Sequence, residues 1–183
     1  MRVLGIDPGS QYLGLGCVEA KGNSFQWIGH RVVKVVKDAS DISERLRLIV
    51  GAVQEVLDLW QPQAVAIEEV FFAKNPQSAL KLGQARGAAL VPVAVNNLPI
   101  YEYAATLVKQ TVTGSGRADK DQVQRMVRAL LAGKAGAAMD FARADASDAL
   151  AIAICHLQHR HKHLILQGSP AKGKTLGAAS RER

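Results

Sequence analysis

Three strand-like segments in a row open the chain, and this opening limits what the remaining residues can complete. Residues 2–7 form a short apolar run, residues 12–18 alternate large apolar residues with glycine, and residues 24–36 are rich in Val and Ile. A Pro-Gly-Ser turn separates the first two segments, and a Lys-Gly-Asn turn separates the second from the third. Turns this short join neighbouring antiparallel strands. The sequence therefore predicts a three-stranded antiparallel meander at its start.

Helices and single strands alternate in the rest of the chain. Asp41 precedes apolar residues at helical spacing that stop at Pro62, and the pair Asn75-Pro76 supplies an N-cap and a proline at the first helical position. In chain order, the elements predicted after the meander are a helix up to residue 61, a strand at 64–68, a helix from 76 to about 90, a strand at 99–103, and two helices that begin near Asp119 and Asp145.

This order of elements, β-β-β-α-β-α-β-α-α, is the layout of a ribonuclease-H-like α/β fold. We expect a mixed five-stranded sheet, with three antiparallel meander strands plus two parallel strands, flanked by helices. The first and fourth strands then lie side by side. With 183 residues, of which 48% are hydrophobic, the chain can bury one core of this size. We predict one domain over residues 1–162 and a basic, disordered tail over residues 163–183.

Four acidic residues fall at the ends of these predicted elements. Asp7 ends the first strand and Glu68 ends the fourth, while Asp145 and Asp148 begin the last helix, where a spacing of three puts them on one face. Gathered at one edge of the sheet, these carboxylates would repel one another, and a fold tolerates such repulsion mainly to bind a cation. Carboxylate oxygens are the ligands that Mg²⁺ prefers. Taken singly, each acid could instead be a turn residue, a solvated strand end or a helix cap.

The chain as a whole is basic, with 23 Lys and Arg against 16 Asp and Glu. A basic surface around a local group of acids is typical of an enzyme that acts on nucleic acid. Charge by itself equally allows a DNA-binding protein without catalysis or a ribosome-associated protein.

Cysteine content and hydropathy favour a soluble, cytoplasmic protein. Cys17 and Cys155 stand alone within apolar runs, so they are predicted to be core residues in a reducing compartment. No signal pattern precedes the first strand, and no uncharged apolar run reaches the ~18 residues that would indicate a membrane-spanning helix.

Four histidines cluster near the end of the last predicted helix: His156, His159, His161 and His163. Basic residues are mixed among them, and no cysteine or acid completes a closed metal site. We therefore expect a solvated segment that attracts DNA weakly.

Six blocks of sequence can be matched to a known family. They are Gly-Ile-Asp-Pro-Gly-Ser at 5–10, Ala-Ile-Glu-Glu-Val-Phe-Phe-Ala-Lys-Asn at 66–75, and the segments at 78–87, 102–104, 108–112 and 144–154. Together they resemble the RuvC family of Holliday-junction resolvases, in uninterrupted order over residues 1–158. The resemblance implies a homodimeric endonuclease that cuts opposed strands of a four-way DNA junction by paired nicks with 5′-phosphate and 3′-hydroxyl ends. It also implies a branch-migration motor of the RuvAB type as a partner.

The resemblance further implies roles for individual residues. The catalytic acids that hold two Mg²⁺ ions, with Mn²⁺ as a substitute, would be Asp7, Glu68, Asp145 and Asp148. Lys109 and Lys120 match family lysines near the scissile phosphate, and Lys120 would share in catalysis. Phe71 matches an aromatic residue that stacks on a base of the opened junction.

Three further basic residues, Lys74, Lys81 and Arg86, lie along or just before one predicted helix. We predict that they extend the DNA-binding groove, and the alternative is ordinary charge on a helix surface.

Other functions stay open at this point. A ribonuclease or rRNA-processing nuclease of the same superfamily could use the same acids, because acids alone do not distinguish RNA from DNA. The Asp-Pro-Gly-Ser segment at 7–10 could be a phosphate loop of an actin-like or sugar-kinase ATPase, but that fold needs a duplicated domain that 183 residues cannot supply. The presence of all four acids argues against a junction-binding protein without catalysis.

Overall fold

The computed structural model describes residues 1–9, 11–22, 24–35, 41–69, 75–131 and 144–167. Phe71 and Lys74 lie outside these residues, as do residues 168–183 of the predicted tail. The elements in chain order are β1 (Arg2–Pro8), β2 (Tyr12–Lys21), β3 (Ser24–Lys34), α1 (Ile42–Trp60), β4 (Ala64–Glu68), α2 (Pro76–Val95), β5 (Ile100–Tyr103), α3 (Ala105–Thr113), α4 (Lys120–Leu131) and α5 (Ala144–Gln167).

The five strands form one mixed sheet in the order β3-β2-β1-β4-β5. β1 pairs antiparallel with β2, and β2 with β3, so the predicted meander is confirmed. β4 lies parallel to β1, and β5 lies parallel to β4. The register sets Ile6 opposite Ile67, so Asp7 and Glu68 follow this pair on adjacent strands. The predicted adjacency of the first and fourth strands is therefore also confirmed.

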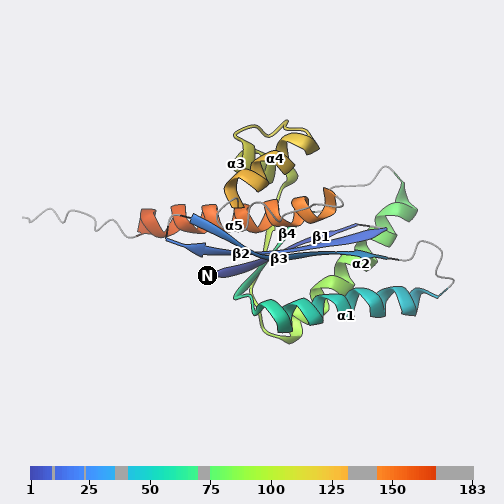
Figure 1. Ribbon diagram of the computed structural model, residues 1–183. Helices are drawn as coiled ribbons and strands as arrows, with labels where there is room; N and C mark the ends of the chain where they lie inside the picture. The colour runs from blue at the N-terminus through green and yellow to red at the C-terminus, as the bar shows by residue number, and fades with distance from the viewer. Residues whose placement is uncertain (10, 23, 36–40, 70–74, 132–143, 168–183) are drawn as a thin grey trace, which may run out of the picture.

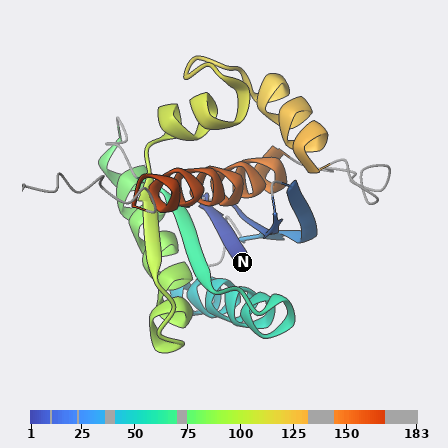
Figure 2. The same ribbon diagram turned by 90° about the vertical axis from the view of Figure 1, so that its left-hand side faces the viewer.

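Helices cover both faces of the sheet (Figures 1 and 2). α1 and α2 pack on one face, where the strands present large residues such as Leu4, Ile6 and Ile67. α5 lies across the opposite face, where the strands present Val3 and Ala66. α3 and α4 pack on the side of α5 that faces away from the sheet.

Glycines on β1 and β2 let α5 approach the sheet closely. A Cβ atom added at Gly5 would lie 1.9 Å from the carbonyl oxygen of Ala149, and one added at Gly14 would lie 2.1 Å from that of Asp145. At Gly16 an added Cβ would lie 2.8 Å from the Leu150 side chain. Since these distances are far below van der Waals contact, α5 rests directly on the main chain of the two strands.

Local predictions at helix starts and at the cysteines are confirmed. The carboxylate of Asp41 accepts a hydrogen bond from the Ser43 N–H at 2.9 Å, and the side chain of Asn75 caps α2 in the same way. The Asp119 carboxylate accepts from the Gln122 N–H at 2.8 Å. Cys17 and Cys155 are both buried, and no disulfide bond joins them.

α3 has no counterpart among the predicted elements, which include no helix between the fifth strand and Asp119. Three threonines and two valines disfavour helix in this nine-residue segment, and no side chain caps its start. Val108 and Val112 are buried in the core that α5 shares, so tertiary packing stabilises a helix that its own sequence does not favour.

α5 is longer than predicted and continues to Gln167, five residues into the segment expected to be a tail. His156 is only 2% exposed, and its Nδ1 lies 2.8 Å from the hydroxyl oxygen of Tyr103 on β5. The prediction that His156 is solvated is therefore wrong, because the turn of α5 that carries it packs against β5. Neither α5 nor any other helix in the described part of the chain has the length and apolar character needed to cross a membrane.

Candidate active site

Two strand ends bring the first pair of acids together. Asp7 on β1 and Glu68 on β4 lie on adjacent strands, and both side chains are half-buried. Because side chains alternate along a strand, Asp7 shares the face of Val3 and Glu68 shares the face of Ala66. Both carboxylates therefore lie on the side of the sheet that α5 covers.

The first turn and a half of α5 carry the second pair of acids. Gly14, which pairs with Asp7 in the sheet, lies against the backbone of Asp145. This contact places the start of α5 beside the end of β1. Asp148 then lines the same pocket as Asp7 and Glu68. Asp145 is not among the residues that line this pocket, but it is near enough to raise the pKa of Asp7.

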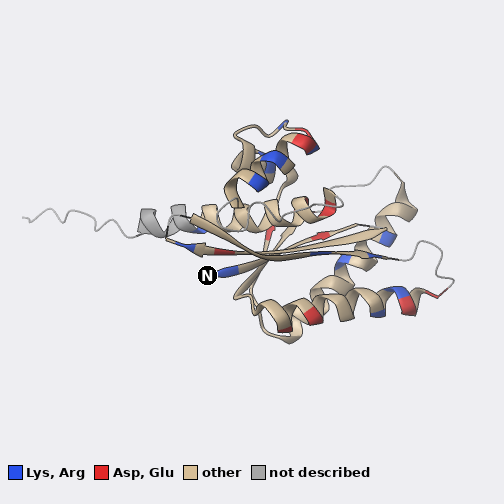
Figure 3. Cartoon of the chain, viewed as in Figure 1, with Lys and Arg blue, Asp and Glu red and all other residues tan. Residues whose placement is uncertain are grey.

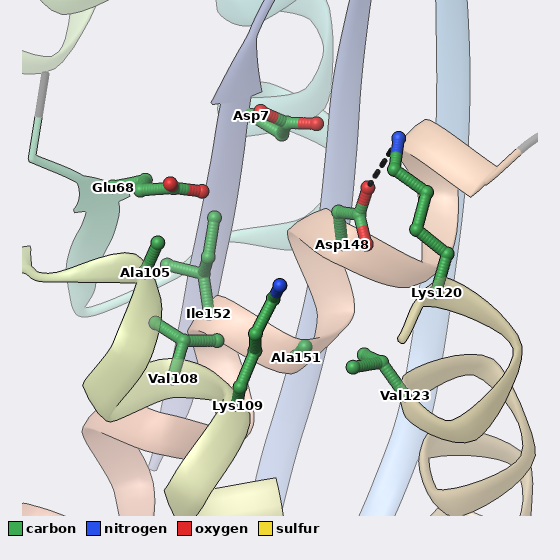
Figure 4. A pocket seen from close by; sticks show the side chains of 10 residues that line it. All are labelled: Asp7, Glu68, Ala105, Val108, Lys109, Lys120, Val123, Asp148, Ala151 and Ile152. Carbon is green, nitrogen blue, oxygen red and sulfur yellow. Dashed lines mark ion pairs between the residues drawn. The ribbon is translucent and has the colours of Figure 1, made fainter. Parts of the chain in front are cut away.

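The pocket has a volume of about 310 Å³, and both acidic and basic side chains line it (Figure 4). Lys109 projects from α3 and Lys120 from the start of α4, and the Lys120 Nζ lies 4.0 Å from an Asp148 carboxylate oxygen. Figure 3 shows acidic residues at the start of α5 and on neighbouring strands, and both basic and acidic residues on α4. The remaining lining residues are Ala105, Val108, Val123, Ala151 and Ile152. Sequence reasoning missed these apolar residues, because no local pattern distinguishes them from the core.

Burial and mutual repulsion raise the pKa values of the acids. The pKa of Asp7 rises from 3.8 to about 7, chiefly because burial disfavours the charged form. The negative charges of Asp148, Glu68 and Asp145 add to this rise, in that order. The pKa values of Glu68 and Asp148 are also raised, and burial is again the largest cause. These three carboxylates are thus costly to ionise where they stand, and a bound cation would relieve that cost.

The donor set fits a hard divalent cation in its chemistry. The anionic groups at the pocket are carboxylates, whose oxygens suit Mg²⁺ or Mn²⁺ better than softer metals. No three acid, histidine or cysteine side chains among the described residues converge closely enough to hold one ion by themselves. The carboxylates instead surround the pocket, and Mg²⁺ in proteins characteristically keeps several water or phosphate ligands besides one or two carboxylates.

Lys81 and Arg86, both predicted to bind DNA, lie in different surroundings on α2. Lys81 is exposed, whereas only 14% of the Arg86 side chain is exposed. Arg86 donates a hydrogen bond to the main-chain carbonyl of Glu68 and forms an ion pair with Glu102 at 2.8 Å. The sequence carries no signal for these contacts, because they depend on how α2 packs against the sheet.

A mixed α/β sheet with acids at the ends of adjacent strands, facing lysines across a pocket, defines a ribonuclease-H-like nuclease. The family model described as "Crossover junction endodeoxyribonuclease RuvC" matches residues 3–156 of the chain. The chain therefore belongs to the RuvC family, whose members are metal-dependent nucleases.

Individual relatives agree with this membership. The crossover junction endodeoxyribonuclease RuvC of Pectobacterium carotovorum is 47% identical over 179 residues, which are 98% of this chain and 98% of that protein. Its counterpart from Yersinia enterocolitica is 53% identical over 157 residues, 85% of this chain and 87% of that protein. The structure of Thermus thermophilus RuvC in complex with Holliday junction substrate is 38% identical with a TM-score of 0.80, covering 89% of this chain and 96% of that chain. The fold and the family resemblance expected from the sequence are confirmed.

Proposed function

We propose that this enzyme resolves four-way DNA junctions by cutting two opposed strands with paired, symmetric nicks. The observation that carries the proposal is the pocket in which Asp7, Glu68 and Asp148 face Lys109 and Lys120. The carboxylates suit divalent cations, and the lysines suit the phosphate that such cations would bind. The Thermus thermophilus relative was solved with a Holliday junction substrate, which supports the same substrate for this chain.

The acids would hold two Mg²⁺ ions, with Mn²⁺ as a substitute. When bound, such a pair stabilises the attacking and leaving oxygens of a phosphodiester, and cleavage would leave a 5′-phosphate and a 3′-hydroxyl. β1 and β4 hold the carboxylates of Asp7 and Glu68 from the sheet, and the start of α5 holds those of Asp145 and Asp148 from above it. The proposed ligands would therefore come from two layers of the fold, and the glycine contacts between β1, β2 and α5 support the fixed spacing of these layers.

Lys109 and Lys120 would bind non-bridging oxygens of the scissile phosphate. The Lys120 side chain is 77% exposed, and its 4.0 Å pairing with Asp148 is loose enough for the ammonium to turn toward a phosphate. There it would offset negative charge that develops during cleavage, and in this role Lys120 would be a catalytic residue. Phe71 is proposed to stack on an exposed base, and Lys74 and Lys81 to bind the DNA backbone.

A homodimer would set one pocket at each of two opposed strands, as paired nicking requires. We also propose a branch-migration motor of the RuvAB type as a partner and a cytoplasmic location. The division of the chain into one nuclease domain and a basic tail stays a prediction.

Asp7→Asn tests the site assignment, because it removes one charge and keeps the shape of the side chain. We expect the variant to lose nicking of a synthetic mobile four-way junction in Mg²⁺ and to keep its binding of that junction nearly intact. Cleavage at the wild-type rate would show that the assignment is wrong.

The choice of substrate is tested with the wild-type enzyme on three substrates of matched sequence: a four-way junction, a linear duplex and an RNA–DNA hybrid. We expect the junction to be cut much faster than the other two. Equal or faster cutting of the hybrid would favour the ribonuclease alternative.

A further inference from the structure

The side chain of Arg86, on α2, contacts two strands of the sheet, β4 and β5. One terminal nitrogen of its guanidinium donates a hydrogen bond to the main-chain carbonyl oxygen of Glu68. The other terminal nitrogen lies 2.8 Å from a carboxylate oxygen of Glu102 on β5. The Arg86 side chain is 14% exposed, against 53% for Glu102. An arginine with both ends of its planar fork engaged inside the protein is poorly placed to reach a DNA phosphate.

The main chain at Glu68 is where β4 leaves the sheet. Tyr103 is the register partner of Glu68 on β5, and the N–H of Glu69 donates to the Tyr103 carbonyl at 2.9 Å. The contact from Arg86 holds the Glu68 carbonyl, on the other side of the same peptide group. Together these two hydrogen bonds fix the peptide that follows the Glu68 side chain. The orientation of that peptide sets the direction in which the last side chain of the strand points.

We propose that Arg86 is a positioning residue for Glu68 and not a DNA contact. It holds the Glu68 main chain so that the carboxylate points into the pocket, and Glu102 orients the guanidinium for this task. The inference rests on the function proposed for the pocket. It replaces the sequence-based prediction that Arg86 extends the DNA-binding groove.

The two roles predict opposite effects for a change at Glu102. If Arg86 bound a phosphate, Glu102→Gln would release its guanidinium and remove a competing negative charge, so the junction would bind more tightly and cleavage would not slow. If Arg86 positions Glu68, the same change loosens the guanidinium and slows cleavage. Because Glu102 is half-exposed, this substitution tests the idea without disturbing the core.

The experiment compares full-length wild type, Arg86→Gln and Glu102→Gln. Junction binding is measured without divalent metal over a range of salt, and single-turnover cleavage is measured at saturating enzyme over a range of Mg²⁺. We expect both variants to bind the junction within about twofold of wild type, with an unchanged salt dependence. The cleavage rate should fall roughly 10- to 100-fold for Arg86→Gln and several-fold for Glu102→Gln, because a misplaced Glu68 carboxylate lowers the rate. Both variants should also need more Mg²⁺ to reach half of their maximal rate.

Glu55→Gln is the matched control, since it breaks the exposed ion pair that Glu55 on α1 forms with Arg31 on β3. It should bind and cleave like wild type. Weaker junction binding by Arg86→Gln, with a salt slope smaller by about one phosphate and a normal rate at saturation, would overturn the proposal in favour of a DNA contact. Wild-type behaviour of both variants would overturn it as well. If Arg86→Gln does not fold, as judged by thermal melting, Glu102→Gln decides alone. Failure of the wild-type enzyme to cut junctions would instead refute the proposed function.

Discussion

Removing the negative charge of Asp7 should stabilise the protein when no metal is bound. Burial and the neighbouring acids raise the pKa of Asp7 from 3.8 to about 7. One pKa unit corresponds to about 1.4 kcal/mol, so ionising Asp7 in the folded state costs on the order of 4 kcal/mol. Asp7→Asn keeps the shape of the side chain and removes this cost.

The stabilisation should depend on pH in one direction. Below about pH 4, Asp7 is protonated in both the folded and the unfolded state, so its burial does not lower the free energy of unfolding through ionisation. Between about pH 4 and pH 7 the unfolded chain releases the proton and the folded protein keeps it, so the free energy of unfolding of wild type falls as pH rises. In Asp7→Asn the asparagine does not ionise, so this residue causes no such fall in the free energy of unfolding. The free energy of unfolding of Asp7→Asn should therefore exceed that of wild type by an amount that grows between about pH 4 and pH 7 and stays constant above this range.

Thermal unfolding in EDTA, followed from pH 4 to pH 8, measures this difference. For a protein of this size, a gap on the order of 4 kcal/mol raises the melting temperature by roughly 10 °C at pH 8. Asp121→Asn, which neutralises an exposed acid on α4, is the control and should give no such gain. Added Mg²⁺ at pH 8 should stabilise wild type more than Asp7→Asn. A variant no more stable than wild type in EDTA at pH 8, or a gap that persists at pH 4, would refute the reasoning.

Three further substitutions probe other parts of the site. Gly14→Ala should slow junction cleavage by about 100-fold while junction binding persists, because its Cβ would push the start of α5 by about 1 Å; a normal rate would contradict the close packing. Lys120→Ala should slow cleavage at least about tenfold and flatten the salt dependence of junction binding, with little change in melting temperature because its ion pair is exposed; an unchanged rate would make Lys120 a surface residue. Tyr103→Phe should lower the free energy of unfolding by about 1–3 kcal/mol in denaturant titration, because buried His156 loses its partner; an unchanged value would show that the bond contributes nothing.

The acids on the strands could be placed from sequence because their positions follow from chain connectivity. Short turns impose the antiparallel meander, and a helical crossover then brings β4 parallel to β1. Once those strands are adjacent, Asp7 and Glu68 must lie together, as the register confirms. The helix caps at Asp41 and Asn75 were also predictable, because each depends on residues only two positions apart.

Features that depend on packing between distant elements could not be predicted in this way. α3 forms because Val108 and Val112 are buried against α5, while its own residues disfavour a helix. Arg86 was predicted to extend the DNA-binding groove, with ordinary helix-surface charge as the alternative, and only the arrangement of α2 and β4 reveals its contact with the Glu68 carbonyl. His156 was expected in solvent because the sequence around it is basic, yet the packing of α5 on β5 buries it.

The two faces of this sheet differ in the substitutions that they can accept during evolution. On the face toward α1 and α2, interlocking side chains can be exchanged for others of similar volume with compensating shifts. On the face toward α5, at Gly5, Gly14 and Gly16, there is no side chain to exchange, and the smallest possible change is a whole methyl group. Peptide geometry therefore fixes the gap between sheet and helix. Substitutions elsewhere in the hydrophobic core would then change the spacing of the proposed metal ligands little.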